Sequence, residues 1–124
     1  MARKLRNIKL YVYDILNSIE KIRVYIQDLN FEDFKLDSKS IDAVIRNFEI
    51  IGEASNHLPI DFKLLHDNIS WRALTDFRNV VIHEYFGVNI EIIWDIAMNE
   101  LPELHSKIKS LYDSMDDTVI QLDY

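Results

Sequence analysis

The densest group of reactive side chains lies between Arg78 and Tyr85, just past the middle of the chain. The run Arg-Asn-Val-Val-Ile-His-Glu-Tyr places a guanidinium, a carboxamide, an imidazole and a phenol on an apolar frame. An imidazole can act as base and then as acid near neutral pH, and a guanidinium can hold a phosphate and stabilise its developing charge. These groups suit metal-independent cleavage of RNA by its own 2′-hydroxyl, which DNA lacks. On spacing alone, a structural helix explains the same residues.

The reactive segment is expected on a helix that begins near Trp71, is capped by Ser70 and is stopped by Gly87. At 100° per residue, Leu74, Phe77 and Val81 face the core, and the opposite face is polar, with Arg72, Asp76, Asn79 and His83. Arg78 lies about 140° around the helix from His83. A two-fold axis would bring Arg78 of one subunit to His83 of the other, so this geometry favours a homodimer.

The rest of the chain predicts an all-α bundle of four to five helices in a single domain over residues 1–124. A first helix over about 4–29 carries a long apolar stripe, formed by Leu5, Ile8, Val12, Ile15, Ile19, Ile22, Ile26 and Leu29. This stripe is either a bundle face or a dimer contact. Residues 30–40 are expected to be a connection, and a second helix over 39–57 is capped by Asp37, Ser38 or Ser40.

Three further features complete the predicted architecture. Residues 61–68 form one short helix, and Asn89 caps a last helix. Pro102 removes a backbone donor and is expected to kink or break that last helix. Residues 116–124 show no helical pattern and are expected to fray.

Composition limits the possible functions. Only two glycines and two prolines occur, which disfavours a turn-rich β-fold. The absence of cysteine excludes disulfides and thiolate zinc sites and suits the cytoplasm. No apolar run approaches a membrane span, and no signal peptide is recognisable. The net charge of −7 argues against a broad nucleic-acid surface, but it allows a small basic cleft or a basic partner protein.

Other polar and aromatic residues leave alternatives open. Arg46, Glu49 and Glu53 share one side of the second helix, which is either a solvated face or the flank of a site. Glu53 either lines the cleft or makes a structural hydrogen bond. Trp71 and Trp94 are expected to be core anchors. Three histidines are expected to be isolated surface or helix-end residues that form no metal site, namely His57, His66 and His105.

The segment from Arg78 to Tyr85 resembles the Arg-x4-His-x-Tyr signature of HepT-like toxins in the HEPN superfamily. Residues 42–54 resemble the second-helix block of that family, and residues 69–71 resemble its entry to the third helix, with Ser70 in place of the usual proline. The remaining matches follow in family order and are Tyr85–Asn89, Trp94 and Leu101–Leu104. Glu84 stands where aspartate is common.

The resemblance implies a dimeric HEPN-type bundle and a metal-independent endoribonuclease toxin of a type VII toxin–antitoxin system, with no cofactor. Arg78 and His83 would be the catalytic pair, with Asn79 in support. The implied partners are an RNA substrate and an MNT-type nucleotidyltransferase antitoxin, which would transfer AMP to Tyr85 and block RNA. Subunits could join into a higher hetero-oligomer in a prokaryotic cytoplasm.

Two other functions remain open from the sequence. The chain is alternatively a non-catalytic helical binding subunit of a nucleotidyltransferase complex, in which the signature serves nucleotide or protein contacts. A weaker alternative is that RNA is bound without being cut.

Overall fold

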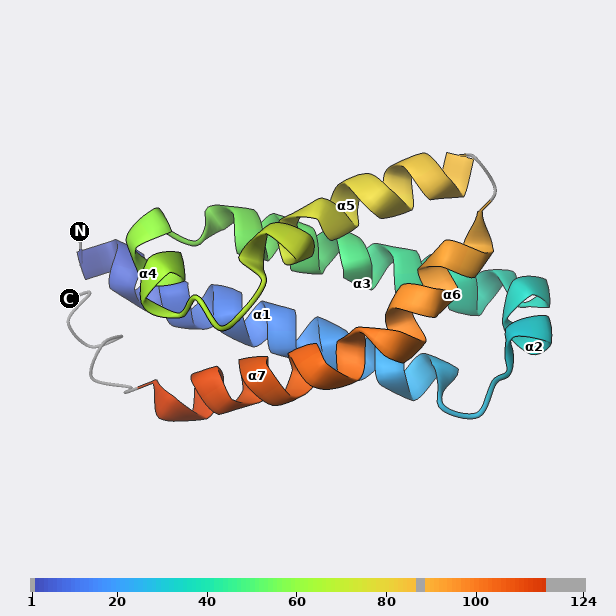
Figure 1. Cartoon of the computed structure of the whole chain (residues 1–124), viewed down its shortest axis with the longest axis horizontal. Coiled ribbons are helices and arrows are strands. Elements are labelled where there is room, and N and C mark those ends of the chain that lie inside the picture. The colour runs from blue at the N-terminus through green and yellow to red at the C-terminus, as the bar shows by residue number, and fades with distance from the viewer. Residues whose placement is uncertain (1, 87–88, 116–124) are drawn as a thin grey trace.

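The computed structural model describes the backbone of residues 2–86 and 89–115, and the side chains of residues 8–79 and 89–115. All regular structure within these ranges is helical, which confirms the predicted all-α class (Figure 1). The helices of this described part are α1 (Ala2–Ile26), α2 (Phe31–Leu36), α3 (Ser38–His57), α4 (Ile60–Leu65), α5 (Trp71–Phe86), α6 (Ile90–Asn99) and α7 (Leu101–Ser114). None of them is long and apolar enough to cross a membrane.

Four long helices form the bundle. The most extensive contacts join α1 to α3, α3 to α5, and α1 to α7, so the packing order is α5, α3, α1, α7. Helices α1 and α3 run in opposite directions, and α6 leads from the far end of α5 back to α7 (Figure 1). Because α3 lies between α1 and α5, any site on its exposed side borders three helices.

The apolar stripe of α1 is used inside the chain. Ile15, Ile19 and Ile22 are fully buried, and they belong to one core cluster that also contains buried residues of α3, α5 and α7. The bundle-face interpretation is therefore correct for the described stripe, and its alternative, a dimer contact, is wrong. Trp71 is a buried core anchor as predicted, and the partly buried Trp94 packs against the same core. The Trp71 indole donates a hydrogen bond to the His66 carbonyl at 2.9 Å.

The predicted connection over residues 30–40 is wrong in part, because the short helix α2 forms inside it. The Asn30 side chain accepts from the backbone N–H of Asp33 at 2.8 Å and begins α2. Phe34 is then fully buried, with its ring centroid 5.0 Å from that of Trp94. A helix of six residues is too short to show an apolar period. The formation of α2 therefore depends on the contact between Phe34 and Trp94 of α6.

The starts of α3 and α6 are set by capping residues that the sequence predicts. Of the three candidate caps for α3, Asp37 is the one used, because its carboxylate accepts from the backbone N–H of Ser40 at 3.2 Å. The Asn89 side chain accepts from Ile92 N–H at 3.4 Å and caps α6. The short helix predicted over 61–68 is α4, which ends earlier, at Leu65. Gly87 as a helix stop and the tail 116–124 lie outside the described residues.

The last helix is broken at Pro102, and a break is one of the two outcomes that the sequence predicts. Helix α6 ends at Asn99, and α7 begins at Leu101 with the proline in its first turn. A proline is harmless there, because the first N–H groups of a helix have no intrahelical acceptor. This break, together with the short α2 and α4, raises the number of described helices above the four to five expected.

Candidate functional site

A groove of about 560 Å³ opens along α3, between α1 and α5. Helix α1 contributes an aromatic ring and a carboxylate, α3 contributes most of the wall, and α5 contributes one arginine from the reactive segment. The lining residues are Tyr11, Asp14, Arg46, Glu49, Ile50, Glu53, Ala54, His57 and Arg78. The groove is therefore the place where the structure brings Arg78 together with groups distant in sequence.

The backbone of α5 lies directly against α3 at Gly52. A Cβ atom built on Gly52 would stand 2.7 Å from the Cβ of Arg78, 3.1 Å from the Arg78 nitrogen and 3.2 Å from the Thr75 carbonyl oxygen. No side chain fits there, so glycine is needed for this close approach. The contact holds the root of the Arg78 side chain against α3.

The tip of Arg78 is also held by α3. Its Nη1 donates to Oε2 of Glu53 at 3.0 Å, and the other oxygen of the same carboxylate lies 3.3 Å from Nε2 of His57. The His57 ring stacks on Tyr11, with centroids 5.2 Å apart and an interplanar angle of 16°. Four side chains from α1, α3 and α5 therefore form one continuous network, which we call the Glu53 network: Tyr11, His57, Glu53 and Arg78.

The Glu53 network is accessible to a ligand. The side chains of Arg78 and Glu53 are each 52% exposed. An ion pair this exposed contributes little to the stability of the fold, because water and salt screen it. The guanidinium has five N–H donors, so donors beyond the one that binds Glu53 can still meet an anion in the groove.

The charge of the groove is mixed. Two arginines, Arg46 and Arg78, are accompanied by the carboxyl groups of Asp14, Glu49 and Glu53. Partial burial raises the pKa of Asp14 above its ordinary value. An anion that entered this groove would therefore meet individual guanidinium groups and not a broad positive surface.

The polar residues that the sequence places on one side of α3 line the groove. Arg46, Glu49 and Glu53 all contribute to its wall, while Arg46 and Glu53 are also exposed, so this side of α3 is a solvated face that borders the candidate site. Glu53 both lines the groove and makes a hydrogen bond. His57 is an exposed helix-end residue, as predicted, but it is not isolated, since it joins the Glu53 network. The i, i+4 spacing of Glu53 and His57 could have indicated their pairing.

The two faces predicted for α5 are confirmed within the described side chains. Leu74 and Phe77 are buried, whereas Arg72, Asp76 and Asn79 are exposed. Helix α5 continues through Phe86 and therefore carries His83 and Tyr85 on its backbone, but the side chains of both lie outside the described residues. At 1.5 Å per residue, His83 follows Arg78 by about 7.5 Å along the helix axis.

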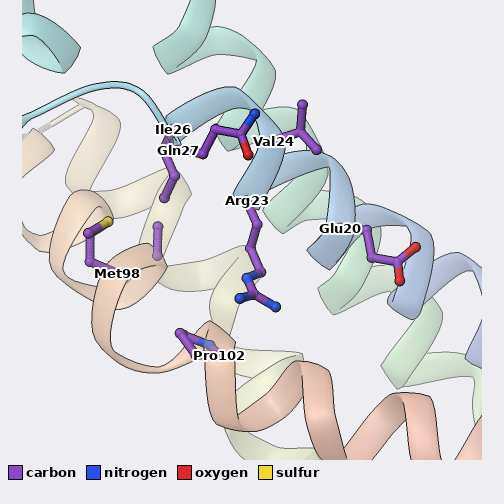
Figure 2. A pocket seen from close by; sticks show the side chains of 8 residues that line it. Glu20, Arg23, Val24, Ile26, Gln27, Met98 and Pro102 are labelled. Atoms are coloured by element: carbon purple, nitrogen blue, oxygen red, sulfur yellow. The ribbon is translucent and has the colours of Figure 1, made fainter.

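A second hollow, of about 400 Å³, lies between the C-terminal half of α1 and the break between α6 and α7 (Figure 2). Figure 2 shows Arg23 directed from α1 toward Pro102. None of the residues predicted to be functional lies there. Nearby, His105 is not an isolated surface residue as expected, because its Nε2 contacts Oε2 of Glu20 at 3.0 Å.

Comparison with known proteins places the chain in a family. Residues 15–111 match the family described as "Ribonuclease HepT-like". A protein of Thermococcus cleftensis named "Probable ribonuclease HepT" is 43% identical over 106 residues, which are 86% of this chain and 96% of that protein. "Putative RNase MJ0127" of Methanocaldococcus jannaschii is 36% identical over 111 residues, 90% of this chain and 92% of that protein. No solved structure gives a significant match. The chain therefore belongs to the HepT-like ribonuclease family.

Proposed function

We propose that this chain is a metal-independent endoribonuclease that acts as the toxin of a type VII toxin–antitoxin system in a prokaryotic cytoplasm. Arg78 and His83 are its catalytic pair, and Asn79 supports them. The observation that carries the proposal is the half-exposed Arg78 guanidinium in the groove of a HepT-like ribonuclease chain. An arginine in such a place can bind a phosphodiester and stabilise the charge that develops on it.

The proposed reaction is an internal displacement at phosphorus. A neutral His83 imidazole takes the proton of the ribose 2′-hydroxyl, and the 2′-oxygen attacks the adjacent phosphorus atom. The bond from phosphorus to the 5′-oxygen breaks, and the same imidazole, now protonated, donates its proton to the leaving oxygen. The products are a 2′,3′-cyclic phosphate and a free 5′-hydroxyl, and Arg78 stabilises the negative charge on the phosphorus oxygens in between.

A homodimer is part of the proposal. Arg78 and His83 point in directions about 140° apart on one helix, and the described carboxylates of the groove outnumber its arginines. A second subunit, related by a two-fold axis, would bring its His83 to the Arg78 of the first. Each of the two clefts would then take one arginine and one imidazole from different subunits.

The substrate chemistry gives a direct test. We expect the purified chain to cut an RNA oligonucleotide in the presence of EDTA and to leave 2′,3′-cyclic phosphate ends, detected by mass spectrometry. An otherwise identical oligonucleotide with one 2′-deoxynucleotide at the cleaved position should remain intact at that position, because the nucleophile is missing. Cleavage at the deoxy position would rule out this mechanism. Failure to cut any RNA would remove the endoribonuclease assignment.

We further propose that an MNT-type nucleotidyltransferase antitoxin neutralises the toxin by modifying Tyr85. The tyrosine oxygen would attack the α-phosphate of ATP, with release of pyrophosphate and of the phenolic proton. The attached AMP would place bulk and negative charge beside the groove and repel RNA.

The modification is testable by mass. Incubation with the partner, ATP and a divalent metal should add about 329 Da per AMP to the peptide that contains Tyr85. A Tyr85→Phe variant is the matched control and should stay unmodified at that peptide. Loss of RNA cleavage should follow the extent of modification. An unmodified Tyr85 in the presence of a partner that is active on other substrates would contradict this proposal.

The acidic composition also supports a second candidate function, which is protein binding. The net charge of −7 and the three carboxyl groups of the groove would suit a basic protein surface. Stable binding of the nucleotidyltransferase by a chain that neither cuts nor binds RNA would support the alternative of a non-catalytic helical subunit. RNA binding without cyclic-phosphate products would instead support a binding protein.

A further inference from the structure

We propose that Glu53 is the positioning residue of Arg78, and that it fixes the direction in which the guanidinium meets the scissile phosphate. This inference rests on the proposed ribonuclease function and deepens it. Glu53 is not placed in contact with RNA. It acts through Arg78, to which its Oε2 is bonded at 3.0 Å.

The first support is that Arg78 is restrained at both ends. At its root, the absence of a side chain at Gly52 lets the Arg78 backbone and Cβ lie against α3. At its tip, Nη1 is bonded to Glu53 on that same helix. Glu53 directly follows Gly52 in sequence, so one short piece of α3 determines both the start and the end of a long, flexible side chain.

The second support is that Glu53 is itself restrained. Its Oε1 lies 3.3 Å from Nε2 of His57, one helical turn further along α3. The His57 ring is stacked on Tyr11 of α1. A carboxylate held only by solvent would leave Arg78 free to rotate with it, whereas this one is tied through His57 to a different helix of the bundle.

The third support is that Glu53 directs Arg78 without blocking it. The contact uses one of the five N–H donors of the guanidinium. The remaining donors keep their fixed planar arrangement, which can bind two phosphate oxygens at once. The pair of Glu53 and Arg78 is half exposed, so it contributes little to the stability of the fold. The main effect of Glu53 is therefore on the orientation of the Arg78 guanidinium.

The kinetic consequence is a loss in kcat with little change in KM. We expect Glu53→Ala to lower kcat by roughly 10- to 100-fold, because small misplacements of a group that binds the transition state cost about this much. KM should change by less than about threefold, since the positive charge of Arg78 remains near RNA. Glu53→Gln retains an oxygen that accepts from Nη1 and should keep kcat within about threefold of the unaltered chain.

The control is Glu32→Gln on α2. Glu32 is an exposed glutamate with a local ion pair of its own, to Lys35 at 2.8 Å, and it lies outside the groove. This variant should leave kcat and KM unchanged. Thermal unfolding followed by circular dichroism should give similar midpoints for the glutamate variants, which separates mispositioning from unfolding.

Three outcomes would overturn the proposal. An unchanged kcat in Glu53→Ala would show that Arg78 needs no partner. Equal losses in Glu53→Gln and Glu53→Ala, with one limb of the pH–rate profile missing, would make Glu53 a proton-transfer group. Faster cleavage with a lower KM in Glu53→Ala would mean that Glu53 competes with RNA for Arg78.

A second measurement does not depend on cleavage. The side-chain ¹⁵Nε–¹H resonance of Arg78, assigned with Arg78→Lys, should shift and lose order in Glu53→Ala but not in Glu32→Gln. If the unaltered chain cuts no RNA, the proposed function fails, while this spectrum still decides whether Glu53 positions Arg78. An Arg78 resonance that is identical in all variants would refute the positioning role.

Discussion

Mixing Arg78→Ala chains with His83→Ala chains is expected to restore RNA cleavage that neither variant has alone. Each single variant should be nearly inactive. Loss of the histidine removes proton transfer that contributes roughly 10²- to 10⁴-fold, and loss of the arginine removes charge stabilisation of about 10²- to 10³-fold. The recovery follows from a cleft that takes Arg78 from one subunit and His83 from the other.

The size of the recovery can be stated in advance. In a heterodimer of the two variants, one cleft lacks both groups and the other has both intact. A mixture of equal amounts that exchanges subunits freely should therefore regain about a quarter of the unaltered activity, because half of the dimers are mixed and each has one working cleft. Cleavage rates measured before and after subunit exchange, with size-exclusion chromatography to confirm dimers, test this expectation.

The result separates two architectures. If Arg78 and His83 act within one subunit, both clefts of every mixed dimer carry a defect and the mixture stays inactive. The Asn79→Ala variant gives a further comparison, measured alone and mixed with either catalytic variant. Because Asn79 is only a supporting residue in the proposal, Asn79→Ala alone should retain more activity than Arg78→Ala or His83→Ala alone.

Gly52→Ala is expected to destabilise the fold and to reduce cleavage together. Helix propensity alone would favour the alanine by about 1 kcal/mol. Against this, the new methyl group would meet the Cβ of Arg78 at 2.7 Å, and its other close neighbours are backbone atoms of α5. These atoms belong to a packed helix and cannot move aside individually, so overpacking of about 1–3 kcal/mol should win.

The same substitution should disturb Arg78. Separating α3 from α5 moves the root of the Arg78 side chain away from Glu53, so kcat should fall even where the chain remains folded. The measurements are chemical denaturation for the free energy of unfolding and cleavage kinetics well below the midpoint.

The control for Gly52→Ala is a pair of variants at Asp42, an exposed position of α3 that lies outside the groove. The difference in unfolding free energy between Asp42→Gly and Asp42→Ala reports the effect of helix propensity without the clash. Both variants should keep kcat close to that of the unaltered chain. A Gly52→Ala chain that is as stable and active as the unaltered one would refute the close-packing argument.

The helices and their faces could be predicted from the sequence because they depend on local rules. The stripe of α1, the buried Leu74 and Phe77 of α5, and the break at Pro102 all follow from periodicity and backbone chemistry. The short helix α2 could not be predicted, because Phe34 is stabilised by Trp94, which lies far along the chain. A segment this short does not contain enough apolar residues at helical spacing to indicate a helix.

The candidate site shows the same division. The sequence by itself determined that Arg78, Asn79 and His83 lie on one helix, that Arg78 is turned away from His83, and that Arg46, Glu49 and Glu53 share one side of another helix, since helical angles depend only on residue spacing. Only the tertiary structure decided that Gly52 brings these helices together and that Glu53 binds Arg78. It also placed Tyr11 beside His57. Such contacts join residues far apart in the chain, so they depend on how whole helices pack and not on any local pattern.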